Sequence, residues 1–118
     1  MTSLVGEHCV ACRRDAPRVT DVEIAELRPQ LPEWTLTNRD GIPCLERIFI
    51  LPNFTTALQF TQQIGELAEA EGHHPAILTE WGRVTVWWWT HTIKGLHRND
   101  FIIAAKTDQL AGQSGAQS

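Results

Sequence analysis

The chain has 118 residues, 14 acidic and 10 basic side chains, a formal net charge of −4 and a 42% apolar content. This length predicts a single domain over residues 1–118, and the lack of a basic run argues against direct nucleic-acid binding. No apolar stretch approaches the roughly 20 residues of a membrane-spanning helix, and the amino terminus lacks a secretory pattern. We therefore expect a cytoplasmic protein without a membrane segment.

The first expected element is a short helix after Thr20. Residues before about position 18 show no period, so we expect a loose segment over about residues 1–18. Thr20 precedes Glu23 by three positions, which is the pattern of a capping box, and Ile24 and Leu27 give an apolar stripe. Pro29 then ends the helix.

A hairpin and a long helix follow. Apolar and polar residues alternate over residues 34–36, and a turn-like sequence follows at 38–41. Residues 44–51 are rich in Leu, Ile and Phe, so this region predicts two strands joined by a turn. Asn53 then begins a helical pattern with apolar residues three and four positions apart. Gly72 ends this helix, and Pro75 prevents its continuation.

The second expected hairpin covers residues 77–81 and 84–90, and a last helix begins at Asn99 or Asp100 and ends before Gly112. The tail, about residues 112–118, is expected to be loose. Alternation along the last strand assigns four side chains to the core, namely Val84, Val86, Trp88 and Thr90. Trp87, Trp89 and His91 would then face away from the helices, where a flat heterocycle or a partner subunit could cover them.

The element order is helix, strand, strand, helix, strand, strand, helix. Hairpins separated by helices predict an α+β fold, a four-stranded antiparallel sheet with the three helices packed on one face.

The cysteines are three in number, Cys9, Cys12 and Cys44, which argues against a disulfide framework in a chain without an export signal. Cys9-x-x-Cys12 could hold zinc or act in redox chemistry, but a structural zinc site needs four ligands and no second pair follows. Free thiols are the simpler interpretation.

Three histidines are the candidate chemical groups. His73 and His74 precede Pro75 in extended geometry, so their rings point in different directions, and His91 lies at the end of the last strand. Histidine titrates near neutrality, so two rings that converge on one molecule can serve as the acid and the base of a dehydration. The neighbouring carboxylates that could orient the rings are Glu69, Glu71 and Asp100.

Other interpretations of these residues stay open. His73 and His74 could interact only with the carbonyls at the helix end, and His91 could be an ordinary surface residue. A three-histidine zinc site is disfavoured, because the side chains of His73 and His74 diverge. We therefore expect no metal and no cofactor.

The run Glu69-Ala-Glu-Gly-His73-His74-Pro75, followed by Trp81, His91 and Asp100, resembles the motif of the pterin-4a-carbinolamine dehydratase family. The resemblance extends from residues 31–34 to the final helix, and Cys9-x-x-Cys12 is similar to bacterial members. One departure is Gly72, where some members carry Asn or Asp.

The resemblance implies dehydration of 4a-hydroxytetrahydrobiopterin, which recycles the cofactor of aromatic amino-acid hydroxylases such as phenylalanine hydroxylase. His73 and His91 would be the acid–base pair, in either order, and His74 would help to bind the pterin. The substrate-binding residues implied by the resemblance are Glu69, Trp34, Thr90 and Asp100.

The family also implies dimers and tetramers. Five Trp and four Phe in so short a chain agree with buried subunit contacts, and we expect a homotetramer. Two alternatives stay open: a non-catalytic dimerisation or coactivator module, and a dehydratase-like protein acting on another pterin, such as one in molybdopterin metabolism.

Overall fold

The computed structural model describes residues 3–10 and 16–114. Within them, one antiparallel sheet has the strand order β1-β2-β4-β3. Its strands are β1 (Thr35–Arg39), β2 (Ile42–Ile50), β3 (Ala76–Glu80) and β4 (Arg83–Trp88). The α-helices are α1 (Asp21–Leu27), α2 (Phe54–Glu71) and α3 (Arg98–Ser114), with short 3-10 turns at Leu4–Gly6 and Arg28–Gln30. The α+β class and the element order are as the sequence predicts.

Local signals begin and end the helices as expected. Thr20 accepts from the Glu23 backbone N–H, and the Glu23 side chain accepts from the Thr20 N–H in return. Asn53 and Thr56 form the same reciprocal pair at the start of α2. Gly72 closes α2 with a φ of 65°, in the left-handed region that favours glycine.

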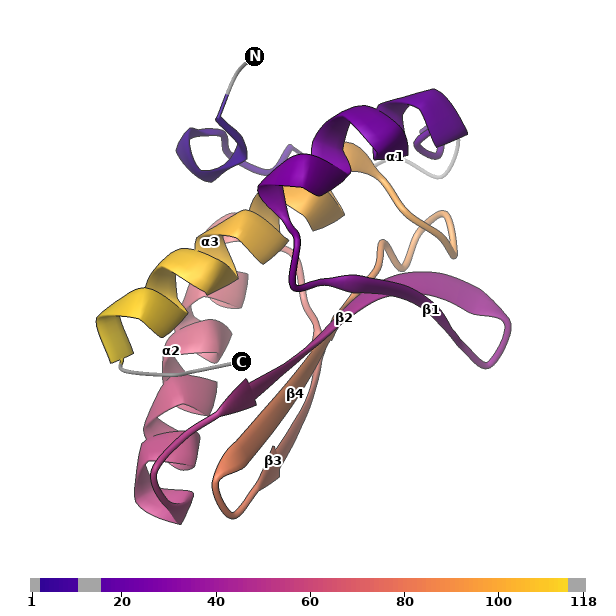
Figure 1. Cartoon of the computed structure of the whole chain (residues 1–118). Helices are drawn as coiled ribbons and strands as arrows, with labels where there is room; N and C mark the ends of the chain where they lie inside the picture. The colour runs from indigo at the N-terminus through magenta and orange to yellow at the C-terminus, as the bar shows by residue number, and fades with distance from the viewer. Residues whose placement is uncertain (1–2, 11–15, 115–118) are drawn as a thin grey trace.

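The core lies between the sheet and the helices α2 and α3, which cover one of its faces (Figure 1). Val84, Val86 and Trp88 of β4 are fully buried on this face, as their alternation predicts. Phe49 of β2 contacts the edge of Phe60 from α2, with ring centroids 4.9 Å apart. Helix α1 lies near the amino-terminal end of α3 (Figure 1). No helix in the described part of the chain is long and apolar enough to cross a bilayer.

The opposite face of the sheet is covered by no described helix. Ile48, Ile50 and Leu78 are between 42% and 47% exposed there. The Arg39 guanidinium lies over this face, 4.5 Å from the ring centre of Trp87 and 5.6 Å from that of Trp89. The expectation that these indoles face away from the helices is confirmed, and an arginine of the same chain covers them.

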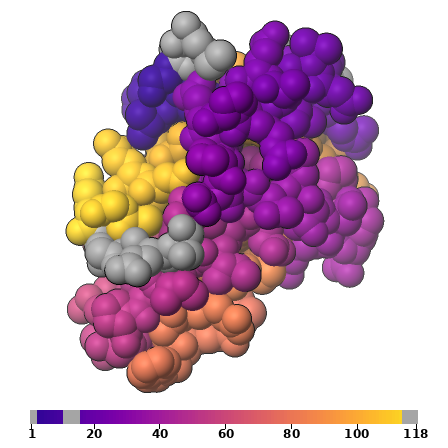
Figure 2. Space-filling view, in the orientation of Figure 1, coloured from indigo at the N-terminus to yellow at the C-terminus, as the bar shows by residue number. Residues whose placement is uncertain are grey.

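Near both ends of the chain the described residues differ from expectation, while residues 1–2, 11–15 and 115–118 of the segments expected to be loose lie outside the described part. Residues 3–10, expected to be loose, pack against α3 (Figure 2), with Leu4 fully buried. Helix α3 begins at Arg98 rather than at Asn99 or Asp100, and it continues past Gly112 to Ser114. Gly112 does not adopt a positive φ, so it does not end the helix. Strand β4 ends at Trp88, and Thr90 pairs with Gly95 in an isolated bridge instead.

Candidate active site

The end of α2 places two adjacent histidines in different surroundings. The His73 N–H donates to the carbonyl of Ala68, 3.1 Å away, as the chain leaves the helix at Gly72. His73 is 7% exposed, whereas His74 is exposed to solvent. The two rings diverge because successive residues of an extended segment point in opposite directions. The expectation that the two rings point in different directions is therefore met.

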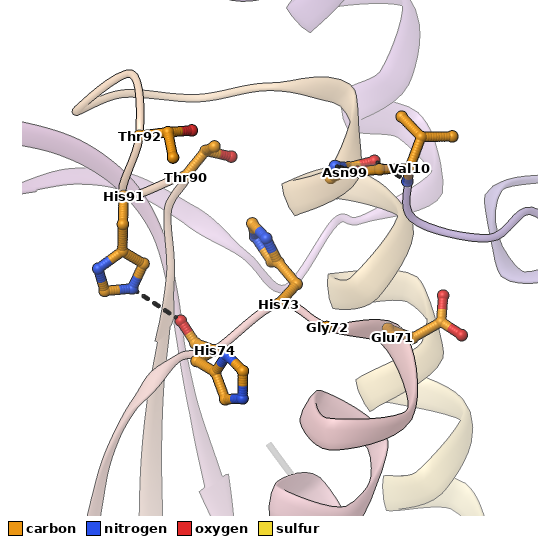
Figure 3. Close-up of a pocket in the computed structure, with 9 residues that line it drawn as sticks. All are labelled: Val10, Glu71, Gly72, His73, His74, Thr90, His91, Thr92 and Asn99. Atoms are coloured by element: carbon orange, nitrogen blue, oxygen red, sulfur yellow. Dashed lines mark hydrogen bonds between the residues drawn. The ribbon is translucent and has the colours of Figure 1, made fainter. Parts of the chain in front are cut away.

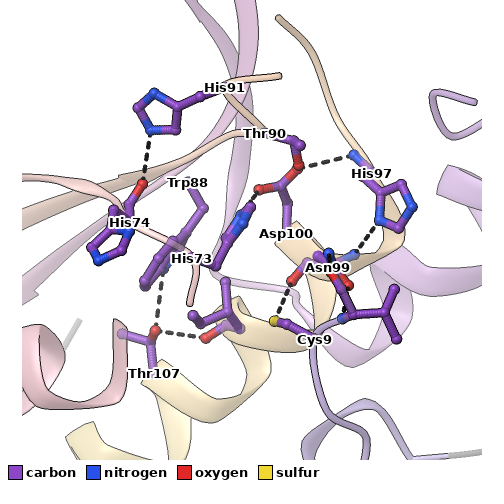
Figure 4. A network of polar contacts seen from close by, with 12 residues as sticks. Cys9, His73, His74, Trp88, Thr90, His91, His97, Asn99, Asp100 and Thr107 are labelled. Atoms are coloured by element: carbon purple, nitrogen blue, oxygen red, sulfur yellow. Dashed lines mark hydrogen bonds and ion pairs between the residues drawn. The ribbon is translucent and has the colours of Figure 1, made fainter. Parts of the chain in front are cut away.

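A fully buried carboxylate, Asp100, holds the His73 ring (Figure 4). Its Oδ1 lies 2.6 Å from His73 Nε2, and its Oδ2 accepts from the Thr90 hydroxyl at 2.8 Å and the His97 backbone N–H at 2.9 Å. An ionised carboxylate can only accept, so Nε2 carries the proton of this hydrogen bond. In this tautomer Nδ1 is the acceptor nitrogen of the His73 ring.

The His73 ring is also held from its face. It stacks on Trp88, with ring centroids 5.8 Å apart and an interplanar angle of 15°. The indole N–H of Trp88 donates to the Thr107 hydroxyl of α3 at 3.2 Å, which fixes the indole in turn. Packing and hydrogen bonding therefore determine both the position and the rotation of the imidazole.

His91 lies on the other side of the same site. Its Nε2 donates to the backbone carbonyl of His74, 3.0 Å away (Figure 3), which leaves its Nδ1 for a bound molecule. The Trp89 ring lies 4.6 Å from it, centroid to centroid. His74 Nε2 lies 3.3 Å from Glu69 Oε1, and both of these side chains are exposed. The predicted pairing of Glu69 with a histidine is therefore present, at the protein surface.

The three histidines line one cavity of about 510 Å³. One part of it is lined by His73, His74, Thr90, His91 and Thr92. Histidines expected to converge from separate segments do so here, together with Thr90, while Asp100 lies behind His73 as its buried partner.

The other part of the cavity is lined by Val10, Glu71, Gly72 and Asn99 (Figure 3). Sequence reasoning did not assign Val10, Asn99 or Thr92 to the site. No spacing pattern links Val10 to Asn99, because their contact spans 89 positions and exists only in the folded chain. Glu71 was a candidate to orient a pocket histidine, but its carboxylate binds the amino-terminal segment instead.

Two tryptophans of the sequence pattern lie away from this cavity. Trp34 was expected to bind substrate, but it is 2% exposed in the core, and its indole N–H donates to Asp108 at 2.8 Å. Arg47 donates to the same carboxylate oxygen at 2.6 Å. Trp81 is 73% exposed at the turn between β3 and β4, at the opposite end of β4 from His91. The geometry gives neither tryptophan a contact with the cavity.

No group of three His, Cys, Asp or Glu side chains converges as a metal site among the residues that the structure describes. Cys12 lies outside those residues. Burial raises the pKa of the Cys9 thiol to about 12, with a further rise from the neighbouring Glu71 carboxylate. Cys44 is fully buried. Neither described thiol has the low pKa of a reactive cysteine.

Comparison with known proteins identifies a matching family and two similar solved structures for this chain. The family model described as pterin 4 alpha carbinolamine dehydratase matches residues 17–110. A transcriptional coactivator/pterin dehydratase from Brucella melitensis is 32% identical, with a TM-score of 0.73 over 81% of this chain and 100% of that chain. A pterin dehydratase-like protein identified as a RuBisCO assembly factor in the alpha-carboxysome is 25% identical, with a TM-score of 0.58 over 68% of this chain and 90% of that chain.

Proposed function

The chain belongs to the pterin 4 alpha carbinolamine dehydratase family, and from that premise we propose that it dehydrates a 4a-hydroxytetrahydropterin to the quinonoid dihydropterin and water. The observation that carries the proposal is the pair of His73 and buried Asp100 at the wall of the cavity. A carboxylate behind an imidazole stabilises the charged ring when it takes up a proton. His73 is therefore equipped to exchange a proton with a bound molecule.

The chemistry requires two proton transfers. The C4a–O bond breaks with its electron pair going to oxygen, which leaves as water once an acid has protonated it. A base removes the proton of the adjacent ring nitrogen, whose electrons form the new C=N bond. His73 and His91 supply the acid and the base, because both lie on the cavity and each has one ring nitrogen held by the protein.

The remaining groups bind and orient. His74 lines the cavity from an exposed position, and Glu69 holds its ring, so both belong to the binding of the pterin. Thr90 acts through Asp100, to which its hydroxyl donates, and thereby keeps the carboxylate in place. No electrons are gained or lost overall, so these imidazoles can perform the reaction without a cofactor.

We place this activity in tetrahydrobiopterin recycling for aromatic amino-acid hydroxylases such as phenylalanine hydroxylase, in the cytoplasm. A reducing compartment suits the thiols of Cys9 and Cys44, which are free in the structure. A hydroxylase assay coupled to limiting tetrahydrobiopterin would test the physiological role. Addition of this protein should sustain the hydroxylase rate, and an unchanged rate would argue for a different pterin.

We also propose a homotetramer. Phe54 and Leu58 of α2 are 43% and 49% exposed, and burying such side chains between subunits would stabilise the assembly. Sedimentation at micromolar concentration should give a species of four chains. A single species of 13.3 kDa would contradict this proposal.

The decisive experiment follows ultraviolet absorbance during dehydration of freshly generated 4a-hydroxytetrahydropterin. Wild-type protein should accelerate the reaction, and His73→Ala and His91→Ala should each lose about a hundredfold or more of that acceleration, the usual scale for an acid–base group. Gln59→Ala, at an exposed position of α2, is the control for handling and folding. Chelator treatment should leave the rate unchanged.

A second candidate function is a partner-binding module without catalysis. The exposed apolar side chains of the uncovered sheet face, Ile48, Ile50 and Leu78, favour it, and the relative identified as a RuBisCO assembly factor shows that such roles occur among similar proteins. No acceleration by wild-type protein would bring this candidate forward. A partner captured equally well by wild type and by His91→Ala would support it.

A further inference from the structure

The amino-terminal segment Ser3–Val10, here called the strap, precedes the family match at residues 17–110, yet it lines the cavity. Leu4 is fully buried at the start of the strap, and Lys106 of α3 donates to the carbonyl of Val5 at 2.9 Å. Arg98 binds both carboxylate oxygens of Glu7, at 2.9 and 2.7 Å. These contacts hold the strap along α3.

The end of the strap is fixed at the cavity itself. The buried Asn99 amide bonds the backbone of Val10 twice: its Oδ1 accepts from the N–H at 3.0 Å, and its Nδ2 donates to the carbonyl at 2.7 Å. The Cys9 N–H donates to Glu71 Oε1 at 2.9 Å, and His8 Nδ1 lies 3.3 Å from Glu71 Oε2. The backbone at Val10 therefore has a set position, and its side chain is 63% exposed at the cavity rim.

The strap changes what this end of the cavity can recognise. The Asn99 amide and both Glu71 oxygens are engaged by the strap, Gly72 has no side chain, and Val10 presents two methyl groups. The opposite end, with the rings of His74 and His91, keeps polar atoms that can bind a ligand. One end therefore offers hydrogen-bonding ring nitrogens, and the other offers the apolar side chain of Val10.

A pterin has the matching asymmetry. Its pyrimidine edge carries the amide and amino groups, its opposite edge is the carbon pair C6–C7 with any substituent, and C4a lies between them at the ring fusion. His73 likewise lies between His91 on one side and Val10 with Asn99 on the other (Figure 3). With C4a at His73 and the pyrimidine edge toward His74 and His91, the C6–C7 edge would lie at the strap.

We propose that the strap is a specificity-determining wall, in which Val10 contacts the C6 substituent of the pterin and limits its size. This inference rests on the proposed dehydratase function. It assigns a role in substrate selection to residues that precede the matched family region, and it predicts preference among pterins that differ at C6 alone.

The test compares two substrates, one with a methyl group and one with a dihydroxypropyl group at C6, on wild type, Val10→Ala and Val10→Trp. We expect Val10→Trp to raise KM for the larger substrate by about tenfold or more relative to its KM for the methyl substrate. Val10→Ala should change the preference in the opposite direction. Val22→Trp, at a site that is 67% exposed on α1, is the matched control.

Fluorescence titration with stable 7,8-dihydropterins carrying the same two substituents gives a readout that does not need turnover. If wild type turns over neither substrate, the proposed function fails, and discrimination in the titration then decides whether Val10 contacts bound pterin. If wild type is active but both Val10 variants keep the wild-type ratio of KM values and of Kd values, Val10 does not limit the size of the C6 substituent and the inference is wrong. Equal losses on both substrates would also overturn the inference.

Discussion

Asp100 Oδ1 lies 2.6 Å from His73 Nε2, with the carboxylate wholly shielded from solvent. Asp100→Asn keeps the shape but removes the charge and can donate a proton to the ring nitrogen, so the wrong tautomer of His73 is favoured. We expect kcat to fall by about 10²- to 10⁴-fold in the dehydration assay.

Asp108→Asn is the matched control, because it makes the same change on the same helix away from the cavity. It should keep the wild-type kcat at a temperature where both variants are folded. Full activity in Asp100→Asn would remove His73 from the mechanism.

The aromatic contacts around Phe49 predict that substitution at this position lowers the stability of the fold strongly. Phe49 is fully buried between Trp34 and Phe60, with ring centroids 6.1 and 4.9 Å away. Phe49→Ala should lower the free energy of unfolding by about 3 to 5 kcal/mol in urea titration, because it leaves a cavity that these rings cannot fill. Trp81→Ala, at a largely exposed turn position, should change it by about 0.5 kcal/mol or less. Similar losses in both variants would refute this picture of the core.

The stability of the strap's contacts with α2 and α3 should depend on pH through the carboxylates of Glu7 and Glu71. The hydrogen bond from Arg98 lowers the pKa of Glu7. Burial opposes ionisation of Glu71, but the Cys9 N–H and His8 outweigh it and lower its pKa as well. A lowered pKa in the folded state stabilises the strap above the ordinary value of 4.5, and this stabilisation is lost as the pH falls through the lowered pKa.

Amide chemical shifts of the strap, followed by NMR from pH 7 to pH 3, would check this. The strap signals should change with a midpoint below 4.5, ahead of the sheet signals, and Glu71→Gln should remove part of the change. A midpoint above 4.5 would contradict the direction of both shifts.

The Cys9 thiol should be slow to react. Since burial raises its pKa to about 12, only on the order of one thiol in ten thousand is ionised at pH 8. We expect alkylation by iodoacetamide to be roughly a thousandfold slower than that of an unstructured cysteine peptide, measured site by site with mass spectrometry. An alkylation rate equal to that of the peptide would mean that the strap opens readily in solution.

Short-range signals in the sequence predicted most of the fold. The capping boxes at Thr20 and Asn53, the glycine at position 72 and the alternation along β4 each depend on residues within a few positions, and each is present in the structure. His73 and His91 line the same cavity, and Asp100, one of the carboxylates that could orient a ring, contacts His73.

Contacts between segments that are distant in sequence could not be predicted from these short-range signals. Trp34 was assigned to the cavity, but a partner 74 positions away, Asp108, holds it in the core. Residues 3–10 show no period, because their position depends on side chains of α2 and α3 rather than on a repeating face of their own. Only the folded chain shows that this irregular segment completes the cavity.

The cavity is assembled from three regions that are distant in sequence: Val10, residues 71–74, and Thr90 to Thr92 with Asn99. In the unfolded chain these segments are apart, so a ligand that contacts them binds the native state alone. Ligand binding then raises the free energy of unfolding, by about 2.7 kcal/mol at a ligand concentration one hundred times Kd, and the melting temperature rises with it. A melting-temperature screen can therefore rank candidate pterins as ligands without any need for the short-lived 4a-hydroxy compound.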